Sequence, residues 1–273
     1  MKTAKSAKNT ARSYNAALSR REVGLLAGWE RERRLLVSLD DIRRAVGADA
    51  ASDVAWRLVR KKALERVGAG KYLLRPLRTM NRPTASSSAV MAAALLQDER
   101  YYLGGLWALT FHRLTEQQYT STLDVFVARR LVGRRLGGTR LVFHRLSRER
   151  LAYGIVEAAI EGVTVNVSDP ERTLLDLLDH PTLAGTGAEA LRHVQEALAR
   201  VSVPKLVDYA ARGSRNSTCQ RLGLLLERVG ASPRLLAPLR KRVRMTKSML
   251  SLRPGYRRQG KFNPRWRVVE NDA

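Results

Sequence analysis

The chain has 273 residues, of which 50 are Lys or Arg and 25 are Asp or Glu, so its formal net charge is +25. Its hydrophobic fraction of 44% is that of an ordinary folded protein, which excludes a wholly disordered basic tail. A positive surplus of this size favours a polyanionic partner, usually a nucleic acid, over a composition that is merely rich in arginine.

Three further features narrow the class of protein. A single cysteine, Cys219, excludes a disulfide framework and a cysteine-based zinc site. The longest uncharged run, residues 83–97, is too short for a membrane-spanning helix, so no membrane contact is expected. The N-terminus is basic and has no secretory apolar core, so we expect a solvated arm over residues 1–17 and a cytoplasmic protein.

The positive charge lies mostly at the two ends of the chain. Residues 1–80 carry a net charge of +11 and residues 238–273 carry +9, whereas residues 81–237 carry only +5. The middle of the chain therefore has the charge balance of a typical globular domain. The N-terminal surplus coincides with a predicted domain that can use it on DNA, and the C-terminal surplus has no assigned role.

The N-terminal part of the chain predicts three helices in succession. Helical spacing starts at Ser19, and a short apolar run after it predicts one strand. Ser38 or Asp40 can cap a second helix, which Gly47 ends. A third helix is expected over residues 52–63.

A predicted hairpin follows these helices. Residues 64–67 and 72–74 are apolar segments that flank a glycine-rich basic turn. Three helices followed by a basic hairpin is the order of a winged helix-turn-helix domain, whose third helix can enter the major groove of DNA. Small domains of this kind also mediate protein contacts, so the DNA interpretation depends on charge and element order together.

The third helix supplies most of the candidate binding residues. Ala55, Leu58 and Val59 form its expected buried stripe, and arginines on the opposite face can pair with guanine O6 and N7. Lys61 or Lys62 can contact phosphates, and the N-terminal arm can add phosphate or minor-groove contacts. The predicted DNA contacts are six residues of this helix and two of the wing: Ser52, Asp53, Trp56, Arg57, Arg60, Lys61, Arg66 and Lys71.

The remainder of the chain predicts a second, larger domain in which strands and helices alternate before a run of helices. The predicted fold is therefore α+β: an N-terminal winged helix-turn-helix domain followed by a larger mixed α/β domain with a helical C-terminal half. The expected divisions are a basic arm at 1–17, the winged-helix domain at 18–80, a linker at 81–88, the α/β domain at 89–245 and a basic C-terminal segment at 246–273.

The larger domain holds carboxylates that an enzyme could use. A metal-dependent nuclease or nucleotidyltransferase would need two or three of Asp124, Asp169, Asp176 and Asp179 to converge. No Asp/Glu-x-Lys tripeptide occurs, and the four histidines have no ligand-like spacing. Asp169 and the residues after it are explained more simply as a capped helix start. We therefore expect no enzyme, no catalytic residue, no metal and no cofactor.

Two other classes stay open as alternatives. One is a nuclease or nucleotidyltransferase that the winged helix directs to nucleic acid. The other is an RNA-binding protein, against which the aromatic fraction of only 6% counts, because stacking on single-stranded bases needs aromatic side chains.

Four stretches of the sequence are similar, in content and in order, to segments of a known protein family. They are LERVGAGKY at residues 64–72, YYLGGLWAL at 101–109 with His112, Leu114, Thr115 and Gln117 after it, VNVSDPERTLLD at 165–176, and RLGLLLE at 221–227. Together they resemble the AbiEi family of antitoxins from bacterial type IV toxin–antitoxin systems, which act in abortive infection.

The resemblance implies a two-domain transcriptional repressor without enzymatic activity. In such proteins the winged helix binds inverted repeats in the promoter of its own operon. The C-terminal domain supports cooperative binding and counteracts a co-encoded nucleotidyltransferase toxin without requiring a stable complex. The sequence departs from the family's pattern in its long basic arm and in its basic tail from Arg240 to Arg267.

Overall fold

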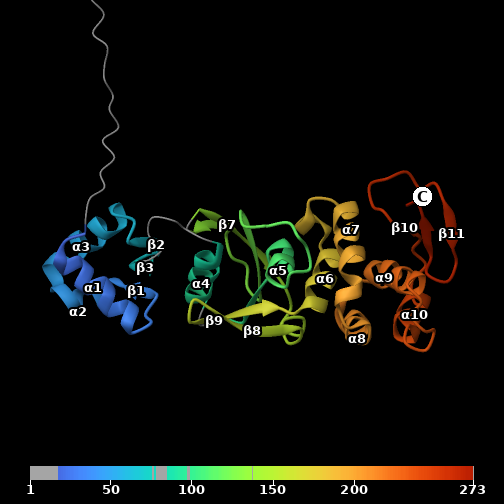
Figure 1. The fold of residues 1–273 in the computed structure, drawn as a ribbon, viewed down its shortest axis with the longest axis horizontal. Coiled ribbons are helices and arrows are strands. Elements are labelled where there is room, and N and C mark those ends of the chain that lie inside the picture. The colour runs from blue at the N-terminus through green and yellow to red at the C-terminus, as the bar shows by residue number, and fades with distance from the viewer. Residues whose placement is uncertain (1–17, 76, 78–84, 97–98, 137, 273) are drawn as a thin grey trace, which may run out of the picture. The chain divides into compact units, whose positions relative to one another are not determined.

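The computed structural model describes residues 18–75, 77, 85–96, 99–136 and 138–272. The chain forms two compact units, Met1–Arg82 and Pro83–Ala273 (Figure 1). The predicted arm at 1–17 lies outside the described residues. In the described part of the chain, no helix is long and apolar enough to cross a bilayer.

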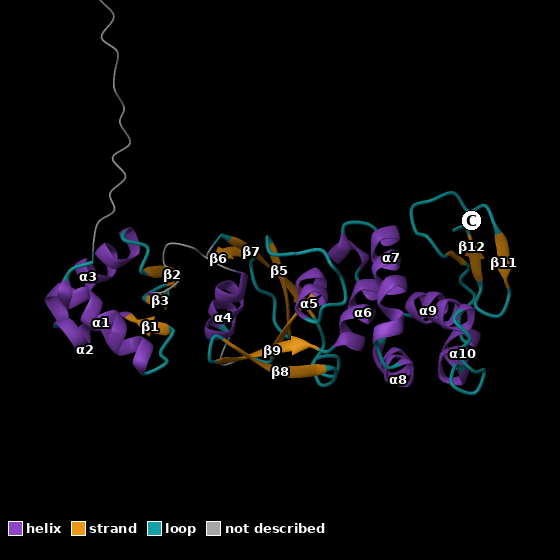
Figure 2. Cartoon of the chain, viewed as in Figure 1, coloured by secondary structure: helices purple, strands orange, loops and turns teal. Residues whose placement is uncertain are grey.

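In its described residues, the first unit consists of three α-helices and three short strands. Figure 2 shows the helices beside the strands. The elements are α1 (Arg20–Arg31), β1 (Leu36–Ser38), α2 (Leu39–Val46), α3 (Ala48–Arg60), β2 (Leu64–Gly68) and β3 (Lys71–Leu74). The strands form an antiparallel sheet in the order β1-β3-β2. This is the winged helix-turn-helix arrangement that the sequence predicts.

Local hydrogen bonds explain where the first two helices begin. Ser19 Oγ accepts from the Glu22 backbone N–H at 3.2 Å, and the Glu22 carboxylate accepts from the Ser19 N–H at 2.7 Å. Ser38 makes the same reciprocal pair with Asp41 at the start of α2, so Ser38 and not Asp40 is the cap.

The third helix starts earlier than the sequence predicts. It begins at Ala48 instead of Ser52, because Gly47 has a φ of 91° and reverses the chain within one residue. The earlier start adds Ala51 to the buried stripe. Val54, inside the predicted range, is buried as well, while Val59 is only half-buried. Together with side chains such as Leu26 and Ile42, this stripe forms the core of the unit.

The second unit is built around a mixed sheet of six strands in the order β6-β7-β5-β4-β9-β8. Its strands are β4 (Tyr101–Gly104), β5 (Thr122–Val127), β6 (Arg134–Leu136), β7 (Thr139–Arg145), β8 (Ile155–Ile160) and β9 (Val163–Ser168). The pairs β4–β9 and β5–β7 are parallel and the others antiparallel. Helix α4 (Ala85–Leu95) packs on the sheet, and α5 (Gly105–Phe111) packs against β4 and β5. Helix α4 begins at Ala85, within the range 81–88 that the sequence predicts as a linker.

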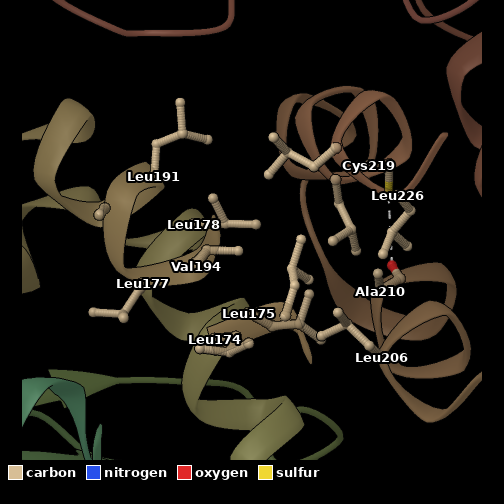
Figure 3. Packing of buried hydrophobic residues seen from close by; sticks show 14 of the residues in the cluster. Leu174, Leu175, Leu177, Leu178, Leu191, Val194, Leu206, Ala210, Cys219 and Leu226 are labelled. Atoms are coloured by element: carbon tan, nitrogen blue, oxygen red, sulfur yellow. Dashed lines mark hydrogen bonds between the residues drawn. The ribbon is translucent and has the colours of Figure 1, made fainter. Parts of the chain in front are cut away.

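Helices form the remaining half of this unit, as expected. They are α6 (Pro170–Asp179), η2 (Pro181–Ala184), α7 (Gly187–Ala197), η3 (Leu198–Arg200), α8 (Val203–Gly213), α9 (Asn216–Arg228) and α10 (Ala237–Arg244). Figure 3 shows the leucines of α6 packed among side chains of α7, α8 and α9. Cys219 lies in this core, and its Sγ donates to the Ala210 carbonyl at 3.6 Å. Cys219 is fully buried among these side chains, and this burial raises the pKa of its thiol to about 11.

The basic C-terminal segment folds onto the same core. It forms a small sheet in the order β10-β12-β11, made of β10 (Leu250–Ser251), β11 (Lys261–Asn263) and β12 (Val268–Glu270). Leu252, Trp266 and Val268 are buried in the helical core, and the Trp266 ring lies against Gly223 of α9. The described residues of the basic C-terminal segment expected at 246–273 therefore pack as part of the second unit.

Candidate nucleic-acid interface

The exposed face of α3 gathers five of the eight predicted DNA contacts. Ala51, Val54, Ala55 and Leu58 point into the core of the first unit. The face opposite them is exposed and consists of Ser52, Asp53, Trp56, Arg57 and Arg60. The helical period thus separates a structural side of α3 from a side that can reach a partner.

Trp56 and Arg60 form a stacked pair on this face. Trp56 has 59% of its surface exposed, which is unusual for so large an apolar side chain. The Arg60 guanidinium lies 4.7 Å from the centroid of the Trp56 ring, one helical turn away. The stacking restricts both side chains without covering them, so both can contact a base edge or a sugar.

Lys61 is held differently from the residues before it. It follows the last residue of α3, and its Nζ lies 2.6 Å from Glu22 Oε2 on α1. Its side chain is only 16% exposed, so it contributes mainly to the packing of α1 on α3. The alternative phosphate contact considered for this position, Lys62, is exposed.

Glu22 also contacts an arginine of the exposed face of α3. Its Oε1 lies 3.5 Å from Arg57 Nε, while half of the Arg57 side chain is covered. Burial raises the pKa of Glu22, but the hydrogen bonds from Lys61 and Ser19 outweigh burial and lower the pKa to about 2. Sequence reasoning missed Glu22, because the contact joins residues 39 positions apart.

The wing carries the last two predicted contacts. Strands β2 and β3 join through a tight turn in which Gly70 has a φ of 62°, and the Gly70 carbonyl accepts from the Leu39 N–H at 2.7 Å. Arg66 and Lys71 are both exposed on this hairpin. The hydrogen bond at Gly70 fixes the turn to the start of α2, so the wing is anchored to the helical part of the unit.

The candidate catalytic carboxylates of the second unit are each engaged in structural contacts. Asp169 caps α6 through the Arg172 N–H at 2.8 Å and accepts from Lys205 and the Tyr209 hydroxyl at 3.0 and 2.9 Å. Asp124 Oδ1 lies 2.8 Å from His144 Nε2. Asp169 and Asp124 therefore each have a structural role in the fold: Asp169 caps a helix, and Asp124 holds a histidine of the neighbouring strand.

The other two carboxylates are buried in α6. Asp176 bonds Arg172 Nε at 2.9 Å and the Tyr102 hydroxyl at 2.7 Å, in a network that ties α6 to β4. Asp179 accepts from Thr218 Oγ1 at 2.6 Å and also pairs with Arg150. Among the described residues, no group of three or more His, Cys, Asp or Glu side chains is placed to hold a metal ion.

The fold and this surface define a two-unit α+β protein with an N-terminal winged helix. The chain is similar to the crystal structure of the RV2827C protein from Mycobacterium tuberculosis, with a TM-score of 0.64, 16% sequence identity and coverage of 93% of this chain and 92% of that chain. No family model matches the sequence, and no curated protein is significantly similar to it. The structural likeness therefore shows a shared fold over nearly the full length.

Proposed function

We propose that the protein binds double-stranded DNA through the exposed face of α3 and the β2–β3 wing. The observation that carries the proposal is the gathering of Arg57, Arg60 and the exposed Trp56 on one face of a winged-helix third helix. The net charge of +11 over residues 1–80 supports it, because contacts to phosphate supply much of the affinity for DNA.

Each side chain on this surface has chemistry that suits a role on a duplex. Arg57 and Arg60 can donate two hydrogen bonds each to guanine O6 and N7, and Asp53 can accept from cytosine N4. Lys71 and Arg66 on the wing suit phosphate oxygens beside the groove. Glu22 orients Arg57 from the protein side, which lowers the entropy lost when that arginine contacts a base.

We assign the protein more specifically as a transcriptional autorepressor and antitoxin. In this role it binds inverted repeats in its own promoter and counteracts a co-encoded nucleotidyltransferase toxin, without a stable complex with that toxin. The support is the AbiEi-like sequence. Two of the four AbiEi-like stretches, residues 101–109 with His112 and residues 165–176, lie side by side in the second unit. Leu103 of β4 pairs with Val167 of β9, and His112 Nε2 lies 2.6 Å from the Ser168 carbonyl oxygen.

The proposal is tested by two measurements. A mobility-shift titration should show that the protein binds the DNA upstream of its own gene more tightly than a scrambled duplex of equal length. Co-expression with a neighbouring nucleotidyltransferase gene should restore growth that the nucleotidyltransferase alone arrests. Equal affinity for both duplexes would refute the proposed repressor role. Growth that is not restored would refute the proposed antitoxin role.

A further inference from the structure

A basic hollow lies between helix α10 and the turn that joins β11 to β12. Its volume is about 260 Å³, and it is lined by Arg240, Val243, Arg244, Pro264, Arg265 and Arg267. Four of the six lining residues are arginines, and none is acidic. The hollow belongs to the basic C-terminal end of the chain, which the proposed DNA surface does not use.

The two walls of the hollow are fixed by the core. On α10, Arg240 and Arg244 lie one turn apart and share a face. In the opposite turn, Asn263 Oδ1 accepts from the backbone N–H of Arg265 at 3.1 Å and of Trp266 at 3.2 Å. The turn therefore has its own hydrogen bonds, and its neighbouring strands hold it in place.

Trp266 anchors this turn. Its ring is fully buried in the helical core, and its Nε1 donates to Glu227 Oε2 at 2.5 Å. Arg265 and Arg267 flank this buried residue, and both line the hollow. Two arginines from the turn and two from the helix therefore line one space, and the backbone that carries them is fixed before any ligand arrives.

The charges around the hollow are largely uncompensated. Arg265 pairs with Glu227, which lies outside the lining. Within the part of the chain that the structure describes, no carboxylate forms an ion pair with Arg240, Arg244 or Arg267. Like charges held close together repel, and an anion between them relieves the repulsion.

We propose that this hollow binds the phosphate groups of a small phosphorylated ligand. Guanidinium groups match phosphate oxygens with two parallel hydrogen bonds, and all four cations here are arginine. The volume lies just below the range of about 300–1,000 Å³ that is usual for ligand pockets, so it suits a compact anion. A hollow of this small volume, lined from both α10 and the β11–β12 turn, fits a free phosphate ester better than the backbone of a duplex, which needs an extended surface.

The test uses the full chain and sodium pyrophosphate in isothermal titration calorimetry at about 0.15 M salt, where weak long-range attraction is screened. Wild type should bind pyrophosphate with a stoichiometry of one. Arg240→Gln and Arg244→Gln should each weaken binding about ten-fold or more, because each removes a charge-assisted hydrogen bond. Lys241→Gln removes one exposed charge from the same helix outside the hollow, and it should change the affinity by less than about two-fold.

A second set of measurements distinguishes pyrophosphate binding in the hollow from DNA binding. Arg57→Gln should leave pyrophosphate binding unchanged. Failure of wild type to bind pyrophosphate saturably, or equal losses in Arg244→Gln and Lys241→Gln, overturns the proposal. It is also overturned if Arg244→Gln loses affinity for a short duplex and pyrophosphate does not compete with that duplex, since the hollow would then hold the DNA backbone. Unchanged melting temperatures confirm that the exposed Arg244→Gln and Lys241→Gln variants are folded.

Discussion

Glu22 on α1 and Lys61 at the end of α3 form an ion pair in which Oε2 and Nζ are 2.6 Å apart and both side chains are largely covered. The second oxygen of Glu22 lies 3.5 Å from Arg57 Nε. One carboxylate therefore joins the first helix to the third and also orients an arginine of the exposed face. The stability of the first unit and the geometry of its candidate DNA surface thus depend on the same residue.

We expect Glu22→Gln to destabilise the first unit by about 1.5–3 kcal/mol, because it leaves the covered Lys61 ammonium without its charged partner. Hydrogen exchange in the full chain measures this locally, and the amides of α1 and α3 should exchange at least about ten-fold faster in the variant. Glu32→Gln is the matched control, since Glu32 follows the same helix but is exposed. Equal exchange rates in the two variants would show that Glu22 does not stabilise the packing of α1 on α3.

The same carboxylate predicts how stability depends on pH. Hydrogen bonds hold the pKa of Glu22 at about 2 in the folded protein, below its ordinary value of 4.5. A carboxyl group with a lowered folded pKa stabilises the fold above its unfolded pKa, and this contribution is lost as pH falls toward the folded pKa. The first unit should therefore lose stability between about pH 4.5 and pH 2.

Hydrogen exchange or denaturant titration across this pH range checks the expectation. The stability of Glu22→Gln should fall less steeply than that of wild type, so the difference between the two should narrow as pH decreases. A difference that stays constant from pH 5 to pH 2.5 would contradict the assigned pKa.

In the second unit, we expect Gly223→Ala to be destabilising by about 1–3 kcal/mol, because the added methyl group would overlap the Trp266 ring. Gly24→Ala is the matched control, since Gly24 is also helical but has open space around its Cα, and this change should stabilise α1 by up to about 1 kcal/mol. Thermal unfolding followed by calorimetry compares the two variants. A melting temperature of Gly223→Ala equal to that of wild type would show that Trp266 is not packed there.

Much of the fold is visible in the sequence because its signals are local. Ser19 caps α1, the alternation of Ala55 and Leu58 with exposed residues marks the face of α3, and the glycine-rich turn marks the wing. The structure also brings Ser52, Asp53, Trp56, Arg57 and Arg60 onto one exposed face, with Arg66 and Lys71 exposed on the wing.

The features that the sequence did not reveal depend on contacts between distant residues or on very short elements. The pairing of Lys61 with Glu22 spans 39 positions, so nothing near Lys61 indicates that it is covered. Strand β6 has only three residues, two of them arginine, and β10 has two residues that pair with β12 in parallel. The start of α3 at Ala48 depends on the positive φ of Gly47. In the sequence, a glycine can mark either the end of a helix or a one-residue link between two helices, so Gly47 did not indicate that α3 follows directly.

Lys71 on the wing should act on DNA affinity without acting on sequence preference. Lys71→Ala should weaken binding to specific and scrambled duplexes by the same factor, because phosphate contacts carry no sequence information. The slope of log affinity against log salt should become shallower by about one unit. Fluorescence anisotropy titrations at several salt concentrations measure both quantities. A loss of affinity confined to the specific duplex would contradict this prediction and show that Lys71 contacts a base.

The central claim is that the exposed face of α3 reads DNA sequence, and Arg57→Ala tests it most directly. The measurement is a pair of mobility-shift titrations, one with the DNA upstream of the protein's own gene and one with a scrambled duplex of equal composition. We predict that the variant loses about 1–3 kcal/mol on the upstream DNA and much less on the scrambled duplex, so that the ratio of the two affinities falls. An unchanged ratio in a folded Arg57→Ala protein would contradict the assignment of this face as the recognition surface.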